Sequence, residues 1–464
     1  SFSYFGGSGM DLIHAVDMDP SGHMVIAGAS NSTNLPASGT AQSEHAGGVW
    51  DGFVARFVGR MPSLDWCTYI GGNSSDQLYA VKFDGGRNIV VGGATSSTEM
   101  PMPNALQQVY NGGGLDALFM RFPMGPSPHE LMLVRGGGQP NGPAYDYFMG
   151  RFEVTCRAFV RFLNDTEANV NNVRGANMFF DEDGNVWMSP ERHQNRHELF
   201  TLWDGHLVYR AEMPIGDRYA VSDLVSARGE RFDGHPITGV SWFGALKYCN
   251  WLTIEAGRSV SQRCYTEGRE PMDWRPVTAT RWQSGRFDVP EREAWLAKKG
   301  FRLPMDGAHG LSSHAGPYNE FYKAASWTGG SNSVYGFGRN SFKPGDANYL
   351  DHGVVRVTET TPVGYFDVPG GSTLGESDGN QNRYGIADLS GNVSEWLSDL
   401  GGSNAPMSRA SYGGSYMYTL PRITDRFFVH PHFTDPFRGF RLASTFREPT
   451  LTAVRVPMRI CICE

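Results

Sequence analysis

One stretch of the sequence, residues 411–443, concentrates side chains that can bind ligands or react. Its two histidines stand one residue apart and can hold a metal ion or exchange protons. Its arginine and aromatic side chains are of the types enriched at binding hot spots. The stretch is compatible with a catalytic loop, a recognition surface or a covered connection. Its candidate ligand-binding residues are Tyr416, Tyr418, Arg422, Arg426, Phe428, His430, His432 and Arg438.

The elements that must position these side chains are short. The stretch opens and closes on strand-like pieces at 413–416 and 439–442, and the residues between them follow neither a helical nor an alternating period. Pro421, Pro431 and Pro436 also oppose a regular element. We therefore expect a loop system that is held at both ends by strands.

Cysteine is another reactive residue type, and the chain has six. None of them forms a CxxC pair or shows the spacing of a zinc finger. Cys249 lies at the end of an expected helix and Cys264 follows it, so these two form either a disulfide or buried free thiols. Cys461 and Cys463 share one strand face of the tail, where binding a metal, crosslinking subunits and remaining solvated are all open interpretations.

The composition narrows the class of protein. A chain of 464 residues with 58 glycines predicts two or three domains that are β-rich or irregular. A net charge of −8 provides no basic field for nucleic acid, and without a run of 18 apolar residues we expect no membrane-spanning segment. The chain begins at Ser1, and we expect a processed N-terminus, for which a removed signal peptide is one explanation.

The first 122 residues contain an internal repeat. The segment from Tyr4 matches the segment from Tyr69, and DGFVARF from Asp51 matches DALFMRF from Asp116, both at an offset of 65 residues. Short apolar runs alternate with turn signals, which predicts four short strands per repeat, as in a propeller blade. The repeats resemble the bacterial β-propeller (SBBP-like) repeat of surface and secreted proteins. This resemblance implies a bacterial protein that is secreted or lies at the cell surface.

Two blades are too few to close a propeller, because each blade buries its faces against neighbours. Three arrangements stay open. Further blades lie upstream, or the pair packs on the second domain, or blades from other subunits complete the ring. The last arrangement makes self-association through the incomplete propeller the expected partner interaction.

A different organisation follows Phe122. Two amphipathic helices are predicted there, one capped by Thr155 and the other by Ser241. Long connections come next, and loops of such length in a compact domain carry function or bind ions. The expected division of the chain is two β-propeller-type repeats at 1–125, a linker with an incoming strand at 126–148, a second domain at 149–446 and a C-terminal tail at 447–464.

Six sequence blocks mark the second domain: EVTCRAFVRFLN, PITGVSWFGALKYCNWL, FRLP, YKAA, YGIADLSGNVSEW and YGGSY…GFRLA. In this order they resemble the formylglycine-generating-enzyme family, also called the sulfatase-modifying-factor domain. The resemblance runs from Leu131 to Phe446 and implies a C-type-lectin-like fold. The expected fold class is therefore α+β, with two blade-like all-β repeats followed by a lectin-like domain of few helices and long loops.

The same resemblance argues against catalysis. Oxidases of this family carry two cysteines after the GGS strand, which bind copper and do the chemistry, and the matching positions here are Tyr418 and Ile423. Neither side chain can replace a thiolate. A related sulfoxide synthase branch uses iron held by three histidines, and here His193 and His197 stand four apart without an evident third ligand. We expect no copper, no iron and no catalytic residue, and hence a pseudo-enzyme.

The resemblance also implies calcium sites with a structural role. At the first site a side-chain oxygen of Asn392, the backbone carbonyl of Val393 and the Glu395 carboxylate can converge on one hard cation. Asn348 and the carbonyl of Tyr349 match part of a second site. The alternative is that Asn392 and Glu395 cap turns and bond to the backbone.

These patterns together predict a non-catalytic extracellular or cell-surface protein with a structural role in assembly and a lectin-like recognition face. One alternative is a monomeric module that binds a glycan or a protein. Another alternative, disfavoured by the missing cysteines, is an oxidoreductase of the formylglycine-generating family.

Overall fold

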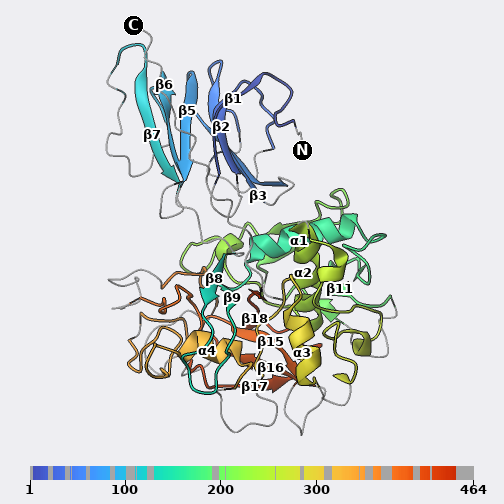
Figure 1. The fold of residues 1–464 in the computed structure, drawn as a ribbon. Helices are drawn as coiled ribbons and strands as arrows, with labels where there is room; N and C mark the ends of the chain where they lie inside the picture. The colour runs from blue at the N-terminus through green and yellow to red at the C-terminus, as the bar shows by residue number, and fades with distance from the viewer. Residues whose placement is uncertain are drawn as a thin grey trace. The chain divides into compact units, whose positions relative to one another are not determined.

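The structure is a computed structural model in which the chain divides into two compact units, Ser1–Gly125 and Pro126–Arg447 (Figure 1). Among the described residues, none of the helices combines the length and apolar character needed to cross a membrane. The structure describes all residues except 1–3, 19–23, 37–41, 43, 59–62, 84–88, 101–109, 111, 123–129, 191–197, 204, 257, 283–286, 308–315, 344, 351–358, 367–378, 401–407, 418–420 and 446–464.

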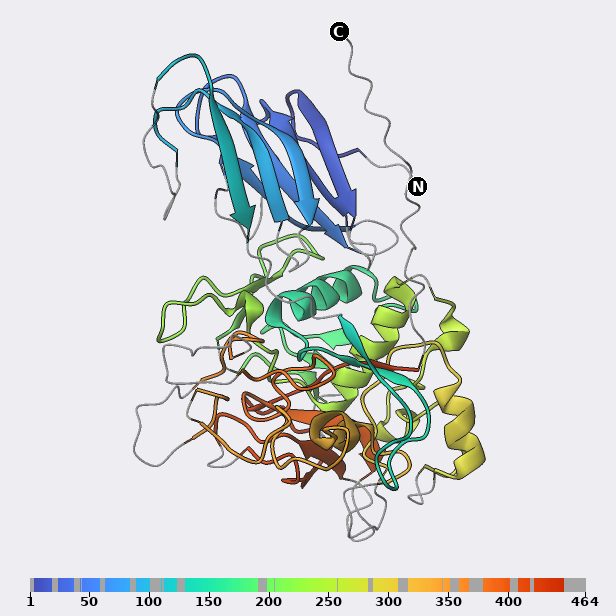
Figure 2. The same cartoon turned by 60° about the vertical axis from the view of Figure 1, so that its left-hand side comes forward.

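The N-terminal unit consists of two antiparallel sheets that pack against each other (Figure 2). The first sheet has the order β1-β2-β3-β4, with β1 at Asp11–Met18, β2 at Met24–Ser30, β3 at Asp51–Val58 and β4 at Ser63–Ile70. The second has the order β5-β6-β7, with β5 at Asp76–Phe83, β6 at Ile89–Thr95 and β7 at Asp116–Phe122. The prediction of four strands per repeat is thus confirmed for the first repeat. It is wrong for the second repeat, in which the described residues form three strands.

The counterpart of β4 in the second repeat lies in the other unit. At the repeat offset of 65 residues, β4 corresponds to residues 128–135, which include β8 (Leu131–Val134). β8 pairs with β9 (Tyr147–Gly150), and β9 pairs in turn with β19 (Ala443–Ser444). The apolar strand β8 therefore helps to close the C-terminal unit, and β7 is left as the last strand of the second sheet.

The two sheets share an irregularity at the repeat offset. The pairing of β1 with β2 shifts register between Ile13 and Ala15, and the pairing of β5 with β6 shifts between Leu78 and Ala80. The two shifts are 65 residues apart, so the repeat extends from the sequence to the backbone hydrogen bonds.

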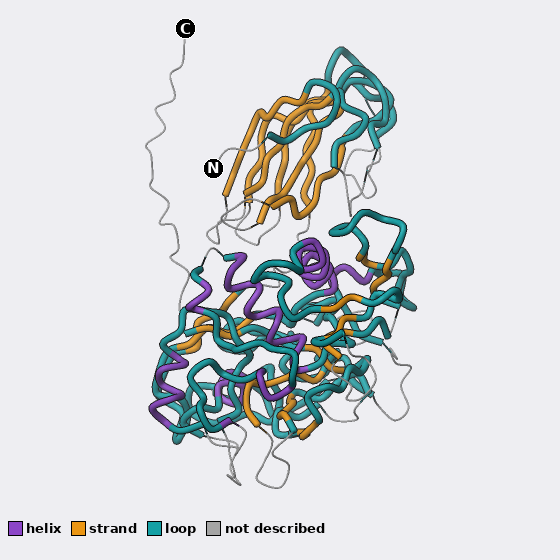
Figure 3. Tube along the Cα trace, turned by 90° about the vertical axis from the view of Figure 1, so that its right-hand side faces the viewer, coloured by secondary structure: helices purple, strands orange, loops and turns teal. Residues whose placement is uncertain are grey.

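The C-terminal unit surrounds short strands and four described α-helices with long loops, drawn teal in Figure 3. The helices are α1 (Cys156–Ala168), α2 (Trp242–Glu255), α3 (Val289–Leu296) and α4 (Glu320–Ser326). Single 3-10 turns lie at Phe232–Gly234, Val260–Gln262 and Pro271–Asp273.

Small sheets accompany these helices. The sheet that carries the candidate site has the order β17-β16-β15-β18, with β15 at Ser394–Leu400, β16 at Arg409–Tyr412, β17 at Phe427–Val429 and β18 at Arg438–Gly439. Two others consist of β10 (Phe179–Phe180), β11 (Val186–Trp187) and β12 (Glu198–Phe200), and of β13 (Leu207–Tyr209) and β14 (Tyr219–Val221).

Both predicted helix caps are confirmed. The Thr155 hydroxyl accepts a hydrogen bond from the backbone N–H of Ala158 before α1, and the Ser241 hydroxyl accepts one from Gly244 before α2. A side-chain oxygen at this position satisfies an N–H that the first helical turn leaves unpaired. Both helices and their first residues were therefore predicted correctly, but only α1 is amphipathic, because α2 is buried on all sides from Trp242 to Thr253.

The core of the C-terminal unit is rich in aromatic side chains, with Trp242, Trp251 and Trp396 buried in it. Cys249 and Cys264 lie in the same core as free thiols, so the disulfide considered for them does not form. Cys461 and Cys463 lie outside the described residues.

Candidate functional site

The candidate recognition segment begins where β16 ends. Gly413 and Gly414 follow Tyr412 with φ values of 94° and 68°, in the left-handed region that favours glycine. A Cβ atom on Gly414 would lie 2.9 Å from the Cα of Pro421, so this turn also needs the small residue. The strand expected at 413–416 is therefore wrong, because the strand ends at Tyr412 and the two glycines start the loop.

Two of the candidate ligand-binding residues are buried. The Tyr416 hydroxyl donates to the carbonyl oxygen of Pro436 at 3.3 Å. Arg438 donates through Nε to the Ser411 hydroxyl at 3.3 Å, and its guanidinium lies 4.7 Å from the ring centre of Trp396. Their expected place on a recognition surface is wrong, since Tyr416 joins the two ends of the loop and Arg438 fixes the second end to the sheet beneath it.

Arg426 also has a supporting position. Its Nη1 donates to Asp306 at 2.9 Å, and the same aspartate accepts a hydrogen bond from the Tyr412 hydroxyl at 2.9 Å. The Arg426 guanidinium lies 5.0 Å from the ring centre of Phe428. The ion pair therefore orients Arg426 beside Phe428, which is one of the exposed aromatic side chains of the loop.

The exposed side chains of the loop include Arg422 and Phe428, as expected. Beyond β17, the rings of His430, His432 and Phe433 lie against one another, and together with Trp203 they make up what we call the aromatic patch. The two histidine rings lie 4.0 Å apart between centres, and His432 lies 5.1 Å from Phe433. Trp203 joins them by donating from its indole nitrogen to the Thr434 hydroxyl at 3.0 Å.

Phe433 is exposed, in agreement with its place among the recognition-type side chains of the stretch. Trp203 is also exposed but was not among the candidate residues. Trp203 lies more than two hundred residues before the loop, and no local pattern marks it.

His430 is the electrostatically distinct member of the patch. Burial, together with the positive charge of Arg409, lowers the pKa of its imidazole. The ring is therefore neutral at pH 7, and its Nδ1 has no hydrogen-bond partner within the described part of the chain. The arrangement provides aromatic faces and a neutral imidazole, which suit stacking and hydrogen bonding to a ligand.

The candidate calcium residues already have protein partners. Both carboxylate oxygens of Glu395 accept from Arg441, at 2.5 and 2.6 Å. The side-chain oxygen of Asn392 accepts from the backbone N–H of Thr361 at 2.9 Å, and Asn348 donates to the carbonyl oxygen of Glu359 at 2.8 Å. Val393 is buried beside them, and so is Tyr349 in a contact with the ring of Phe342.

These contacts follow the alternative interpretation, in which Asn392 and Glu395 order turns and neighbouring chain, and calcium binding stays a prediction. Across the described residues, no three His, Cys, Asp or Glu side chains are grouped so that they could hold a metal ion. Several predicted positions lie outside the described residues, namely Tyr418, His193, His197 and the segment 351–358.

The comparison with protein families decides the identity of the C-terminal unit. Residues 142–446 match the sulfatase-modifying factor enzyme 1-like domain. The chain belongs to this family. Two solved structures are similar to it, each at 18% identity over 68% of this chain: the crystal structure of CarF, with 98% of its chain covered and a TM-score of 0.42, and Treponema denticola variable protein 1, with 94% covered and a TM-score of 0.37. No curated protein matches the chain.

The two positions that the resemblance matched to the oxidase cysteines are Tyr418 and Ile423 in this chain. Ile423 is fully buried in the apolar core below the loop, and residues 411–443 contain no cysteine. Burial raises the pKa of the Cys67 and Cys264 thiols to about 12 and that of Cys249 well above its usual range. These three thiols are therefore protonated at neutral pH and do not supply the thiolate that copper binding and oxidation need.

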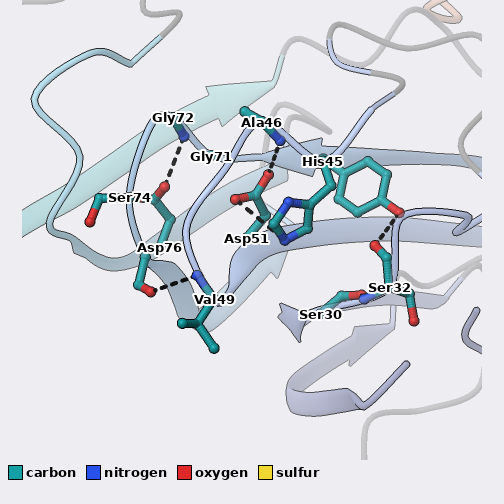
Figure 4. Close-up of polar contacts among 12 residues, drawn as sticks. Ser30, Ser32, His45, Ala46, Val49, Asp51, Gly71, Gly72, Ser74 and Asp76 are labelled. Atoms are coloured by element: carbon teal, nitrogen blue, oxygen red, sulfur yellow. Dashed lines mark hydrogen bonds and ion pairs between the residues drawn. The ribbon is translucent and has the colours of Figure 1, made fainter. Parts of the chain in front are cut away.

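A second polar cluster lies in the N-terminal unit, outside the matched residues. Figure 4 shows Asp51, the first residue of β3, between His45 and Asp76. His45 Nε2 lies 3.9 Å from Asp51, which also accepts from the backbone N–H of Ala46 at 2.7 Å, and Asp76 accepts from that of Gly72 at 2.8 Å.

Burial raises the pKa of the Asp51 carboxyl to about 6, against the smaller opposing influences of its Ala46 hydrogen bond and of His45. The cluster can therefore take up a proton in mildly acidic solution. It was not among the predicted sites, although the match of Asp51 with Asp116 in the repeat points to this position.

Proposed function

We propose that this chain is a non-catalytic structural protein, secreted or at the cell surface, in which the family domain provides a recognition face and the N-terminal repeats provide assembly. The observation that carries the proposal is the aromatic patch with its neighbours Arg422 and Phe428. Trp203, Arg422, Phe428 and Phe433 are exposed and the two histidines are half-buried, and all but Trp203 lie on a loop that Tyr416 and Arg438 hold at its ends. Exposed side chains on an anchored loop can bind a ligand without loss of fold.

Binding is tested by substitution of the exposed residues. Wild-type protein bound to a glycan array or to a panel of surface proteins is compared with the variants Phe433→Ala and Arg422→Glu. We expect both variants to lose binding at least tenfold while the melting temperature stays unchanged. Val334→Ala, which alters an exposed side chain outside the loop, serves as the control. A fall in melting temperature together with binding would make the loop structural and contradict the proposal.

The absence of catalysis is tested directly. The protein is incubated with Cu(I) and a cysteine-containing sulfatase peptide, and the peptide mass is followed for conversion of cysteine to formylglycine. We expect no conversion, because the thiolate ligands of the family's oxidases are missing. Turnover would overturn the non-catalytic assignment and revive the oxidase alternative.

Calcium is proposed as a structural ion of the family domain. Removal of calcium with a chelator should lower the melting temperature of the C-terminal unit, and Asn392→Ala should abolish that difference. An unchanged melting temperature would leave Asn392 as a residue that only orders the turn around Thr361.

A further inference from the structure

The two sheets of the N-terminal unit have equivalent faces, because their strands are related by the repeat. We define the leading face as the one that carries Ile13, Val16 and Met18 in the first sheet and their counterparts Leu78, Val81 and Phe83 in the second. The trailing face is the opposite one, which carries Val25, Ala27 and Val54 in the first sheet and their counterparts Val90, Gly92 and Phe119 in the second.

Within the chain, the trailing face of the first sheet packs on the leading face of the second. Val54 and Leu78 are 0% exposed at this contact and Val81 is 4% exposed. This buried contact shows that a trailing face can pack directly on a leading face.

The same positions are exposed at the two outer faces of the pair. On the leading face of the first sheet, the β1 side chains Ile13 and Val16 are 54% and 57% exposed, whereas Ile26 and Phe53 on the neighbouring strands are buried with Phe5 and Leu35. On the trailing face of the second sheet, Phe119 is 71% exposed and Val90 is half-buried. Exposed apolar side chains at equivalent repeat positions have the character of an interface without its partner.

The charges are also compatible with a repeat of the internal contact. Within the chain, Lys82 donates to Asp17 across the two sheets at 2.7 Å. Asp17 and Lys82 occupy equivalent repeat positions, 65 residues apart. When the trailing face of one copy meets the leading face of another, Lys82 therefore comes opposite Asp17 of the other copy, and the pair again has opposite signs.

We infer that a second copy of this chain occupies these faces, with the leading face of its first sheet on the trailing face of the second sheet of its neighbour. This inference rests on the assembly role proposed above and is independent of the recognition face. The contact is head-to-tail, and such contacts close into rings when the rotation allows it. Propellers have about four to eight blades, so a ring built from the two sheets of residues 1–125 takes about two to four copies.

The experiment measures solution mass by light scattering for wild type, Val16→Glu and Phe119→Glu. Wild type is expected at two to four times the 51.1 kDa of one chain. Each variant has one blocked face and is expected to lose the ring. Val49→Glu, which changes an exposed valine between β2 and β3, is the control and keeps the wild-type mass.

The decisive sample is an equimolar mixture of the two variants. Phe119→Glu keeps a free leading face and Val16→Glu keeps a free trailing face, so the mixture should form one-to-one dimers of about 102 kDa and nothing larger. Variants that stay monomeric in the mixture would overturn the head-to-tail arrangement. If either variant loses its folded circular dichroism, Ile13→Glu replaces Val16→Glu and Val90→Glu replaces Phe119→Glu.

The other outcomes separate this inference from the broader assembly role. A monomeric wild type contradicts both. A wild type that assembles while both variants assemble equally well contradicts this interface and leaves assembly through another surface.

Discussion

At the scale of single residues, Arg441 dominates the charge balance inside the C-terminal unit. It pairs with both oxygens of Glu395 and donates to the backbone carbonyl oxygens of Gly150 and Ala387. Glu153 lies 3.9 Å away, and burial raises the pKa of its carboxyl well above the usual range. Arg441 is thus the buried cation that compensates the Glu395 carboxylate.

Replacement of Arg441 should therefore be costly. Arg441→Met leaves the Glu395 carboxylate buried without its partner, and the free energy of unfolding should fall by about 3–5 kcal/mol. Urea unfolding of the C-terminal unit measures this loss. The double variant Arg441→Met/Glu395→Gln should recover part of it, and Arg135→Met, which removes an exposed ion pair, should cost at most about 1 kcal/mol. A single variant as stable as this control would contradict the assignment.

The Asp51 carboxyl predicts a pH dependence for the N-terminal unit. Its pKa rises from an ordinary value of 3.8 to about 6 on folding, mainly through burial. The folded state therefore holds the proton more tightly, so this group destabilises the fold progressively as pH rises from about 4 to 6 and costs up to about 3 kcal/mol above that range.

Asp51→Asn removes this cost while retaining an oxygen that can accept from Ala46. We expect the variant to be more stable than wild type at pH 7.5 and equal to it at pH 4, as measured by urea unfolding at both values. Asp116→Asn changes the equivalent position of the second repeat, which is less buried, and serves as the control. An equal effect of Asp51→Asn at the two pH values would contradict the raised pKa.

At the scale of elements, the sequence predicted the structure correctly where the pattern is local. Thr155 and Ser241 were predicted as caps because a cap and its helix are neighbours in the chain. The repeat alone could not predict the sheet that β8 joins. By the repeat, β8 would pair with the edge of the second N-terminal sheet, but it pairs with β9 instead. The burial of Arg438 likewise depends on Trp396, 42 residues away, and no periodicity connects the two.

Because a cap acts on the helix next to it in the chain, the effect of removing the cap can also be predicted. Thr155→Val keeps the shape of the buried side chain and removes the acceptor for the Ala158 N–H, so stability should fall by about 1–2 kcal/mol. Thr155→Ser keeps the acceptor and loses one methyl group, and it should be the more stable of the two variants in urea unfolding. The reverse order would show that packing of the methyl group outweighs the cap.

At the scale of the whole molecule, the two units differ in how far they bury their own apolar side chains. The C-terminal unit closes its own core and recruits β8 for it, whereas the N-terminal unit leaves apolar side chains exposed on the outer side of each sheet, Val16 on the first and Phe119 on the second. An interface between copies stabilises the folded state by mass action, so its contribution increases with protein concentration. Only the unit that carries the interface should respond in this way.

Calorimetry should therefore resolve two unfolding transitions with different concentration dependence. Over a hundredfold increase in protein concentration, the midpoint of the N-terminal unit should rise by several degrees while that of the C-terminal unit stays constant, since linkage acts only on the unit that binds the second copy. Val16→Glu should abolish the dependence without moving the C-terminal midpoint, and Val49→Glu should preserve it. If both midpoints rise together, the contact between copies involves the family domain as well, and the open sheet faces are not sufficient to explain assembly.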